Sequence, residues 1–295
     1  MKYAFVLILA LHWIVPLQAA QTPHARDADI AARAVFAELV DEWVRDANCE
    51  VQLCGISIAA LAEMDERSIN SLRWLASPDR FDQWKAAQSR RETLVRSNPS
   101  SFVPVIREAL RLPKPEDLQV PTTKEGRTED APEQYRKQLA TCNAAYQVLA
   151  LLPAVMRDPI LRDTFDAMLT KGREAALRYQ PEYLEWIRAG RPKDTEAAVM
   201  TNSRRASWYL FRAGGAITCA TSARSEVLVE PVFALLASEG GGLAQTCVDY
   251  LERFPQRYEE FIRRLSEILD SGRPLGSDRR YNIEQAIKRM EASKS

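Results

Sequence analysis

Carboxylates are the side chains that could carry acid–base chemistry in this chain, because histidine is almost missing. The two histidines are His12, inside an apolar N-terminal segment, and His24, in the polar stretch after it. We expect both histidines to lie outside the folded body, which would exclude Ser-His-Asp and Cys-His catalysis and zinc–histidine sites. The sequence also has no GxxxxGK[ST] phosphate loop and no GxGxxG dinucleotide turn. Any catalysis should therefore depend on an acid in a pocket that raises its pKa, as in glycosidases.

Glu226 is the candidate for such an acid. Pro231 follows it by five residues, Gly-Leu-Ala-Gln occupies 242–245, and Tyr-Asn occupies 281–282. This order resembles the lytic transglycosylases, whose pattern is Glu-Ser, a proline a few residues on, Gly-Leu-Met-Gln and a later Tyr-Asn. The chain departs from that pattern, since Val227 replaces the serine and an alanine replaces the methionine. The resemblance implies a glycan- or peptidoglycan-cleaving enzyme in which Glu226 is the acid.

The cysteines could form disulfides in an oxidising compartment. The chain has five, at Cys49, Cys54, Cys142, Cys219 and Cys247. We predict one bond between Cys49 and Cys54 and a second between Cys219 and Cys247, while Cys142 could replace a partner in either. On a continuous helix, Cys49 and Cys54 would lie ~7.5 Å apart along the axis, so their bond requires a bend in the chain. No CxxC redox motif and no paired CxxC zinc spacing is present.

Arginine and aromatic side chains offer two candidate binding surfaces. They comprise the charged segment 79–97 with Arg90 and Arg91, and the later group Arg204, Arg205, Trp208 and Tyr209. The second group could bind an anion, because its cations lie within one helical turn of its aromatic rings. The simpler alternative is that the charged faces are solvated and the aromatic rings are core residues.

The first twenty residues have the layout of a secretory signal peptide. Lys2 provides the positive start, an apolar run extends over 3–17, and Ala19 and Ala20 are small residues suited to cleavage. The run is shorter than the ~20 residues that a membrane span needs, and no cysteine follows the cut to carry a lipid. We therefore expect cleavage near Ala20 and a periplasmic or secreted protein without a stable membrane anchor. The alternative is an uncleaved N-terminal anchor helix.

Composition and charge are those of an ordinary globular protein. Apolar residues make up 46% and charged residues 27% of the 295 residues, and Lys plus Arg equals Asp plus Glu at 40 each. This balance gives no attraction to nucleic acid or to an anionic membrane surface. We expect no cofactor, because no cofactor-binding motif is present.

Helical periodicity extends over nearly the whole chain, and no run reads as an alternating strand. Val35, Phe36, Leu39, Val40 and Trp43, for example, form one stripe on a helix. The pattern predicts an all-α protein of roughly a dozen helices, arranged as an irregular multi-helix bundle or a short α-solenoid.

Prolines and glycines set the expected boundaries between these helices. Helices should start near Pro159 and Pro181, and Gly214–Gly215 should break another. Residues 113–131 contain three prolines, a glycine and no apolar period, which predicts a linker or long loop. This loop would follow a signal peptide at 1–20 and an N-terminal helical region at 21–112, and precede a C-terminal helical region at 132–295.

These observations favour a secreted helical protein that acts by binding another protein rather than by catalysis. An inhibitor, an immunity protein or an envelope scaffold would fit, with the 113–131 loop or the 79–97 helix as the contact surface. The alternatives are the glycan-cleaving enzyme based on Glu226 and a small-ligand binding protein with an apolar cavity between its helices.

Overall fold

The computed structural model describes residues 23–46, 66, 69–70, 78–114, 117, 133–193, 196–238, 242–272 and 275–293. Within these residues the chain is all-α, with ten α-helices, two short 3₁₀ helices and no strand. This confirms the all-α prediction for the part of the chain that is described. The predicted signal peptide and the predicted Cys49–Cys54 bond lie outside the described residues. None of the described helices is long and apolar enough to cross a membrane.

The N-terminal helices pack around α6. They are α1 (Pro23–Asp46), α4 (Pro78–Ser97) and α5 (Pro99–Ala109), which all contact α6 (Glu133–Leu151). α1 begins at Pro23, so His24 lies in its first turn and not, as expected from the sequence, in a polar tail before the fold. The predicted apolar stripe of α1 is buried, from Val35 to Trp43. Trp43 also donates a hydrogen bond from Nε1 to Gln147 Oε1 of α6 at 3.3 Å. The amphipathic pattern therefore identified the buried face of α1 correctly.

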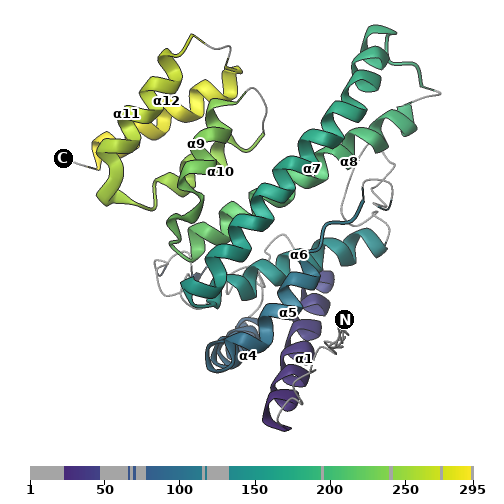
Figure 1. Cartoon of the computed structure of the whole chain (residues 1–295), viewed down its shortest axis with the longest axis vertical. Helices are drawn as coiled ribbons and strands as arrows, with labels where there is room; N and C mark the ends of the chain where they lie inside the picture. Colours follow the sequence, from purple (N-terminus) through teal and green to yellow (C-terminus); the bar gives the residue numbers. More distant parts are fainter. Residues whose placement is uncertain are drawn as a thin grey trace, which may run out of the picture.

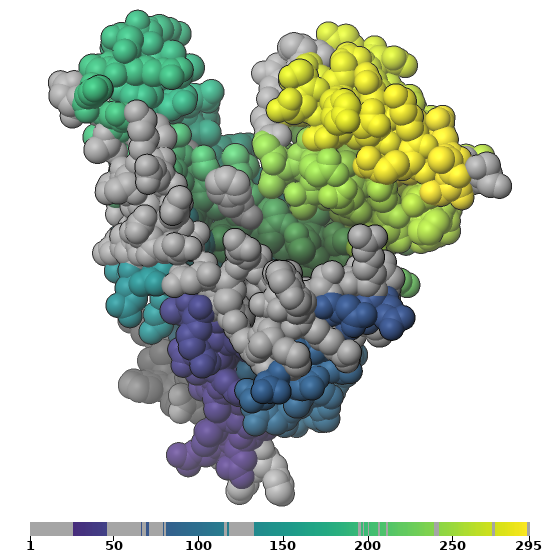
Figure 2. All heavy atoms as spheres, turned by 180° about the vertical axis from the view of Figure 1, so that it is seen from behind, coloured from purple at the N-terminus to yellow at the C-terminus, as the bar shows by residue number. Residues whose placement is uncertain are grey.

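The two longest helices form an antiparallel arm (Figure 1). They are α7 (Ala154–Arg188) and α8 (Glu196–Ser222), which pack against each other along their length. Seen from behind, the tip of this arm stands apart from the C-terminal helices (Figure 2). The tip thus exposes an outer helix face that no other described helix covers in these views.

α7 continues through both prolines at which the sequence predicted a helix start. Pro159 and Pro181 lie inside it, so those two predicted boundaries are wrong. Pro181 has no N–H to donate to the carbonyl of Leu177, which costs the helix one hydrogen bond. Packing offsets this loss, because Tyr179 is buried against α8 and Trp186 Nε1 donates to the Pro192 carbonyl at 3.0 Å.

α8 likewise continues through Gly214–Gly215, where the sequence predicted a break, so that boundary is also wrong. The glycines allow two other helices to approach. A Cβ at Gly215 would lie 2.8 Å from Tyr146 Cε2 of α6, and one at Gly214 would lie 3.0 Å from Leu243 Cδ2. Close packing, rather than backbone freedom, explains the glycine pair.

The C-terminal helices complete one core that begins in α1. They are η4 (Glu226–Leu228), α9 (Val229–Ala237), α10 (Ala244–Leu251), η5 (Pro255–Arg257), α11 (Tyr258–Asp270) and α12 (Ser277–Ala292). A single hydrophobic cluster includes Leu39 of α1, Leu149 of α6, Phe261 of α11 and Met290 of α12. Helices from both sides of the 113–131 stretch therefore contribute to the same core.

Candidate functional site

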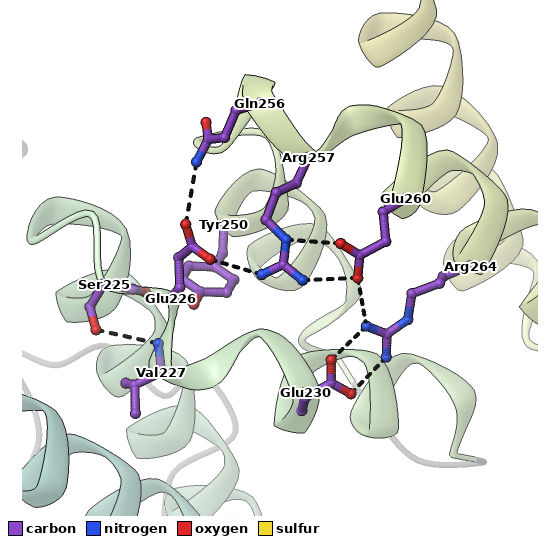
Figure 3. Close-up of polar contacts among 9 residues, drawn as sticks. All are labelled: Ser225, Glu226, Val227, Glu230, Tyr250, Gln256, Arg257, Glu260 and Arg264. Atoms are coloured by element: carbon purple, nitrogen blue, oxygen red, sulfur yellow. Dashed lines mark hydrogen bonds and ion pairs between the residues drawn. The ribbon is translucent and has the colours of Figure 1, made fainter.

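The backbone around Glu226 is fixed by three hydrogen bonds of its neighbour Ser225. The Ser225 hydroxyl accepts from the Val227 N–H at 3.4 Å and donates to Asp158 Oδ1 at 2.8 Å. The Tyr250 hydroxyl donates to the Ser225 carbonyl at 2.7 Å. Ser225 is buried, so these bonds hold the start of η4 against α7 and α10, with Glu226 pointing outward (Figure 3).

The Glu226 carboxylate is partly exposed to solvent and is bound by two neighbouring side chains. Its side chain is 46% exposed and forms an ion pair with Arg257 Nη1 at 2.8 Å. Gln256 Nε2 donates to its other oxygen at 3.3 Å. A general acid has to keep its proton, which requires a desolvated setting without a cation at the carboxylate. The Glu226 carboxylate is instead exposed to solvent and paired with Arg257, so it does not meet this requirement.

The ion pair of Glu226 continues as a chain of alternating charges (Figure 3). Arg257 donates to both oxygens of Glu260, at 2.8 and 3.0 Å, and Arg264 donates to Glu260 at 3.3 Å. Arg264 also binds both oxygens of Glu230, at 2.6 and 2.8 Å. The hydrogen bonds from Arg264 hold the pKa of Glu230 below its ordinary value.

The position of this charge network indicates a structural role. Arg257 lies over the ring of Phe261 at 4.8 Å, and Arg264 lies over the ring of Phe233 at 3.8 Å. The network thereby connects η4 and α9 to α11. Glu230 and Arg264 border a cavity of about 400 Å³, but Glu226 does not line it.

Two other residues of the transglycosylase-like pattern, Gln245 and Tyr281, are not among the hydrogen-bond partners of the Glu226 carboxylate. Gln245 donates to Asp249 along α10 at 2.5 Å, and Tyr281 is exposed on α12. Comparison of the chain with protein-family models, curated proteins and solved structures found no match. Functional inference therefore depends on the geometry of this chain's own residues.

Arg90 and Arg91 connect α4 to α1. Arg90 Nη2 donates to both oxygens of Glu38, at 2.8 and 2.9 Å. The guanidinium of Arg91 is buried, pairs with Glu42, and contacts Glu38 at 3.4 Å. Of this pair, only Arg90 remains substantially exposed to a partner.

The second predicted surface lies mostly in the interior. Trp208 and Tyr209 are buried in a small cluster with Tyr179 of α7, as the core alternative expected. The Tyr209 hydroxyl donates to the Pro113 carbonyl at 2.8 Å. Arg204 and Arg205 are half-buried on the preceding turn, where Arg205 Nη1 donates to Asn202 at 3.2 Å. The two arginine groups lie on different helices, α4 and α8.

The predicted Cys219–Cys247 disulfide is not formed. Cys142, Cys219 and Cys247 are free, buried thiols, so Cys142 does not replace either partner. The Cys219 thiol instead donates to the Tyr146 carbonyl of α6 at 3.3 Å. Burial raises the pKa of Cys219 and of Cys247 to about 12, which keeps both thiols protonated and unreactive at neutral pH.

A metal centre has no basis in the described part of the chain. There, no group of three or more His, Cys, Asp or Glu side chains is placed to hold a metal ion.

The outer face of α7 is the feature that the sequence analysis missed. Leu177 is 79% exposed, Leu184 is 40% exposed and Ile187 is 36% exposed. Together with the exposed Pro181 they form an apolar stripe, which we call the outer arm face. Helical spacing places Leu177, Pro181 and Leu184 opposite the buried Tyr179. That spacing was the available signal, but the boundary predicted at Pro181 divided the stripe between two helices.

Proposed function

We propose that this chain is a secreted helical protein that acts by binding a partner protein, and that the outer arm face is the contact surface. The observation that carries the proposal is the exposure of Leu177, Leu184 and Ile187 on one side of a projecting helix. A helix packed on one side normally presents polar residues on the other. A clustered apolar face that remains in water is typical of an interaction site.

The arm does not need these side chains for its own stability. Tyr179 and Trp186 provide the buried contacts on the inner side of α7, while Leu177 and Leu184 lie on the opposite side. Covering the exposed parts of Leu177 (79%) and Leu184 (40%) would contribute about 2–3 kcal/mol to a complex, a factor of about 30–150 in affinity.

The spacing and the flanking charges indicate what kind of surface the partner presents. Leu177, Pro181 and Leu184 follow the i, i+4, i+7 pattern by which one helix packs along another. Glu174, Arg173 and Arg188 are exposed beside the stripe, so both signs of charge border it. We therefore assign the occupant as an amphipathic helix of the partner, with mixed charge along its edges.

Secretion in this proposal is supported by residues 1–20. Their positive start, short apolar run and small residues are typical of a cleaved leader. Sequencing the N-terminus of the protein recovered from outside the cytoplasm tests this part. A mature chain starting near Gln21 supports it, and a retained Met1 contradicts it.

The arrangement of the helices is part of the same proposal. We describe it as an irregular bundle with one long arm rather than as a solenoid, because the larger of its two hydrophobic clusters joins α1 to α12. Catalysis at Glu226 finds no comparable support, since Arg257 and Gln256 occupy the carboxylate.

The test compares two variants of α7. Leu177→Glu with Leu184→Glu places charges in the outer arm face, while Val155→Glu changes a side chain that is 81% exposed on the same helix outside it. Each purified chain captures proteins from the extracytoplasmic fraction of its source cells, with chemical cross-linking and mass spectrometry as the readout. Melting temperatures show whether each variant is folded.

One protein cross-linked to the arm by the wild type and by Val155→Glu, but lost from the folded double variant, is the expected result. Equal capture by all three chains contradicts the assignment of the surface. Sedimentation velocity of the purified chain, without other proteins, tests whether it forms a dimer. A dimer that the double variant abolishes would make the occupant a second copy and refute the partner-protein proposal.

A further inference from the structure

The outer part of the arm has a small hydrophobic cluster of its own. We call residues 172–188 of α7 and 196–210 of α8 the distal arm. This second cluster joins the distal arm to α6, and its members are Cys142, Ala175, Tyr179, Trp208 and Tyr209. None of them belongs to the large cluster that joins α1 to α12. Parts of a protein with separate cores can open separately, because opening one part leaves the contacts of the other intact.

The boundary between the two clusters lies at the same level in both helices of the arm. In α7, Met168 belongs to the large cluster and Ala175 to the second. In α8, Tyr209 belongs to the second cluster and Ala213 to the large one. The two helices also pack against each other along their length. A bend at this level would therefore move the distal arm as one unit and leave the large cluster in place.

The contact that docks the distal arm on α6 contains buried polar atoms without hydrogen-bond partners. Among the described residues, nothing pairs with Trp208 Nε1 or Arg212 Nε of α8, or with Gln138 Oε1 of α6. All three atoms are closed to water in the docked arrangement. Buried polar atoms are nearly always paired in folded proteins, because an unpaired one loses its hydration without compensation. Undocking would return these atoms to water, so their burial weakens the docked contact.

The second cluster and hydrogen bonds from α8 oppose this cost. The Tyr209 hydroxyl donates to the Pro113 carbonyl at 2.8 Å, and Arg212 Nη1 donates to Asn143 Oδ1 at 3.0 Å. A pocket of about 630 Å³ lies in the same contact, between the end of α5, the first half of α6 and Trp208. The docked distal arm is therefore held by a contact that is neither fully packed nor fully hydrogen-bonded.

We propose that the distal arm is a hinged unit that undocks from α5 and α6 while α7 and α8 stay paired with each other. Undocking changes the direction in which the outer arm face points, and it exposes Trp208 and Cys142 to water. The proposal does not depend on what the outer arm face binds, and its test needs no partner protein.

Three buried thiols of the chain report on the two clusters. Cys142 belongs to the second cluster, whereas Cys219 and Cys247 belong to the large one. The purified full chain is exposed, without denaturant, to a maleimide attached to a polyethylene glycol chain, which is too large to enter the pocket that Cys142 lines. The protein is then unfolded, the remaining thiols are blocked with iodoacetamide, and mass spectrometry of the tryptic peptides gives a labelling rate for each cysteine.

We expect the large maleimide to label Cys142 at least about tenfold faster than Cys219 and Cys247. Equal rates for the three thiols would overturn the proposal, because only global unfolding would then expose them. Rapid labelling of Cys142 by iodoacetamide but not by the large maleimide would also overturn it, since the small reagent would have entered through the pocket of a docked arm.

Two tyrosine variants test whether the docking contact controls the opening. Tyr209→Phe removes the bond to the Pro113 carbonyl and should raise the Cys142 rate by up to about tenfold. The matched control is Tyr250→Phe, which removes a bond of the same kind, 2.7 Å long, to the Ser225 carbonyl in the large cluster. It should leave the Cys142 rate unchanged, and an equal effect of both variants would contradict the hinge.

A third variant changes the rate in the opposite direction. Gln138→Met keeps the length of the side chain and removes the unpaired buried oxygen, so it should slow the labelling of Cys142. Faster labelling would show that the oxygen does not weaken docking. Amide hydrogen exchange separates a hinge from local unfolding. If Tyr209→Phe accelerates exchange over 176–188 as strongly as it accelerates Cys142 labelling, the distal arm unfolds and the hinge is refuted.

Discussion

Replacing Gly215 by alanine should destabilise the protein, although alanine is the better helix former. A Cβ at this position would lie 2.8 Å from Tyr146 Cε2 and 3.0 Å from Cδ2. The Tyr146 ring cannot easily move away. It is buried, its hydroxyl donates to the Arg212 carbonyl at 3.0 Å, and it contacts Met168 Sδ at 3.2 Å.

Two opposing effects set the size of the change in the free energy of unfolding. Alanine in a helix interior gains about 1 kcal/mol over glycine. Overpacking a rigid contact costs about 1–3 kcal/mol. We therefore expect Gly215→Ala to lower stability by about 1 kcal/mol, a decrease in melting temperature of about 2–4 °C. Gly172→Ala is the matched control, because its Cβ would only touch Leu210 Cδ2 at 3.4 Å, and it should be neutral or stabilising.

The assay is urea unfolding followed by circular dichroism, with each glycine variant made in the wild type and in Tyr146→Leu. Removing the ring should remove the clash, so Gly215→Ala should become stabilising in the Tyr146→Leu background. A coupling free energy near zero between positions 146 and 215, or a Gly215→Ala protein more stable than the wild type, would refute the packing explanation for the glycine pair.

Two further predictions concern the helix contacts and the thiols. Arg91→Ala leaves the carboxylate of Glu42 without its buried partner and should cost about 2 kcal/mol. Arg90→Ala removes a more exposed pair and should cost less than about 1 kcal/mol. Equal urea midpoints for the two variants would contradict this. Because burial raises the pKa of Cys219 and Cys247 to about 12, unfolded thiols ionise first, so stability should be lost as pH rises from about 9 to 12. Urea midpoints across that range measure the loss, and rapid iodoacetamide labelling of both thiols in the native protein at pH 8 would argue against burial.

The sequence predicts elements well where one face of a helix is packed. The stripe from Val35 to Trp43 in α1 was correct, because its apolar residues recur every three or four positions and all pack on one side. Boundaries were wrong where local preference and packing disagree. Pro181 and Gly215 disfavour helix locally, but contacts with residues distant in sequence outweigh that preference.

Candidate sites were harder to predict, because exposure and partners depend on which helices meet. In the sequence around Glu226, nothing indicates that Arg257, 31 residues later, forms an ion pair with its carboxylate. Periodicity allowed Trp208 to be a core residue, but its partners Tyr179 of α7 and Cys142 of α6 depend on how α8 fits against those helices. The sequence predicted a disulfide between Cys219 and Cys247, but each is buried as a separate thiol.

The contact between α1 and α6 also determines when this chain can begin to fold. Trp43 and Gln147, which meet across that contact, are separated by 104 residues. At a translation rate of about 5–20 residues per second, α6 leaves the ribosome roughly 5–20 s after α1. Until then, α1 can pack only on α4 and α5, and the part of its apolar face that α6 covers is available to chaperones. The first helix therefore cannot complete its packing before about half of the 295 residues have been made.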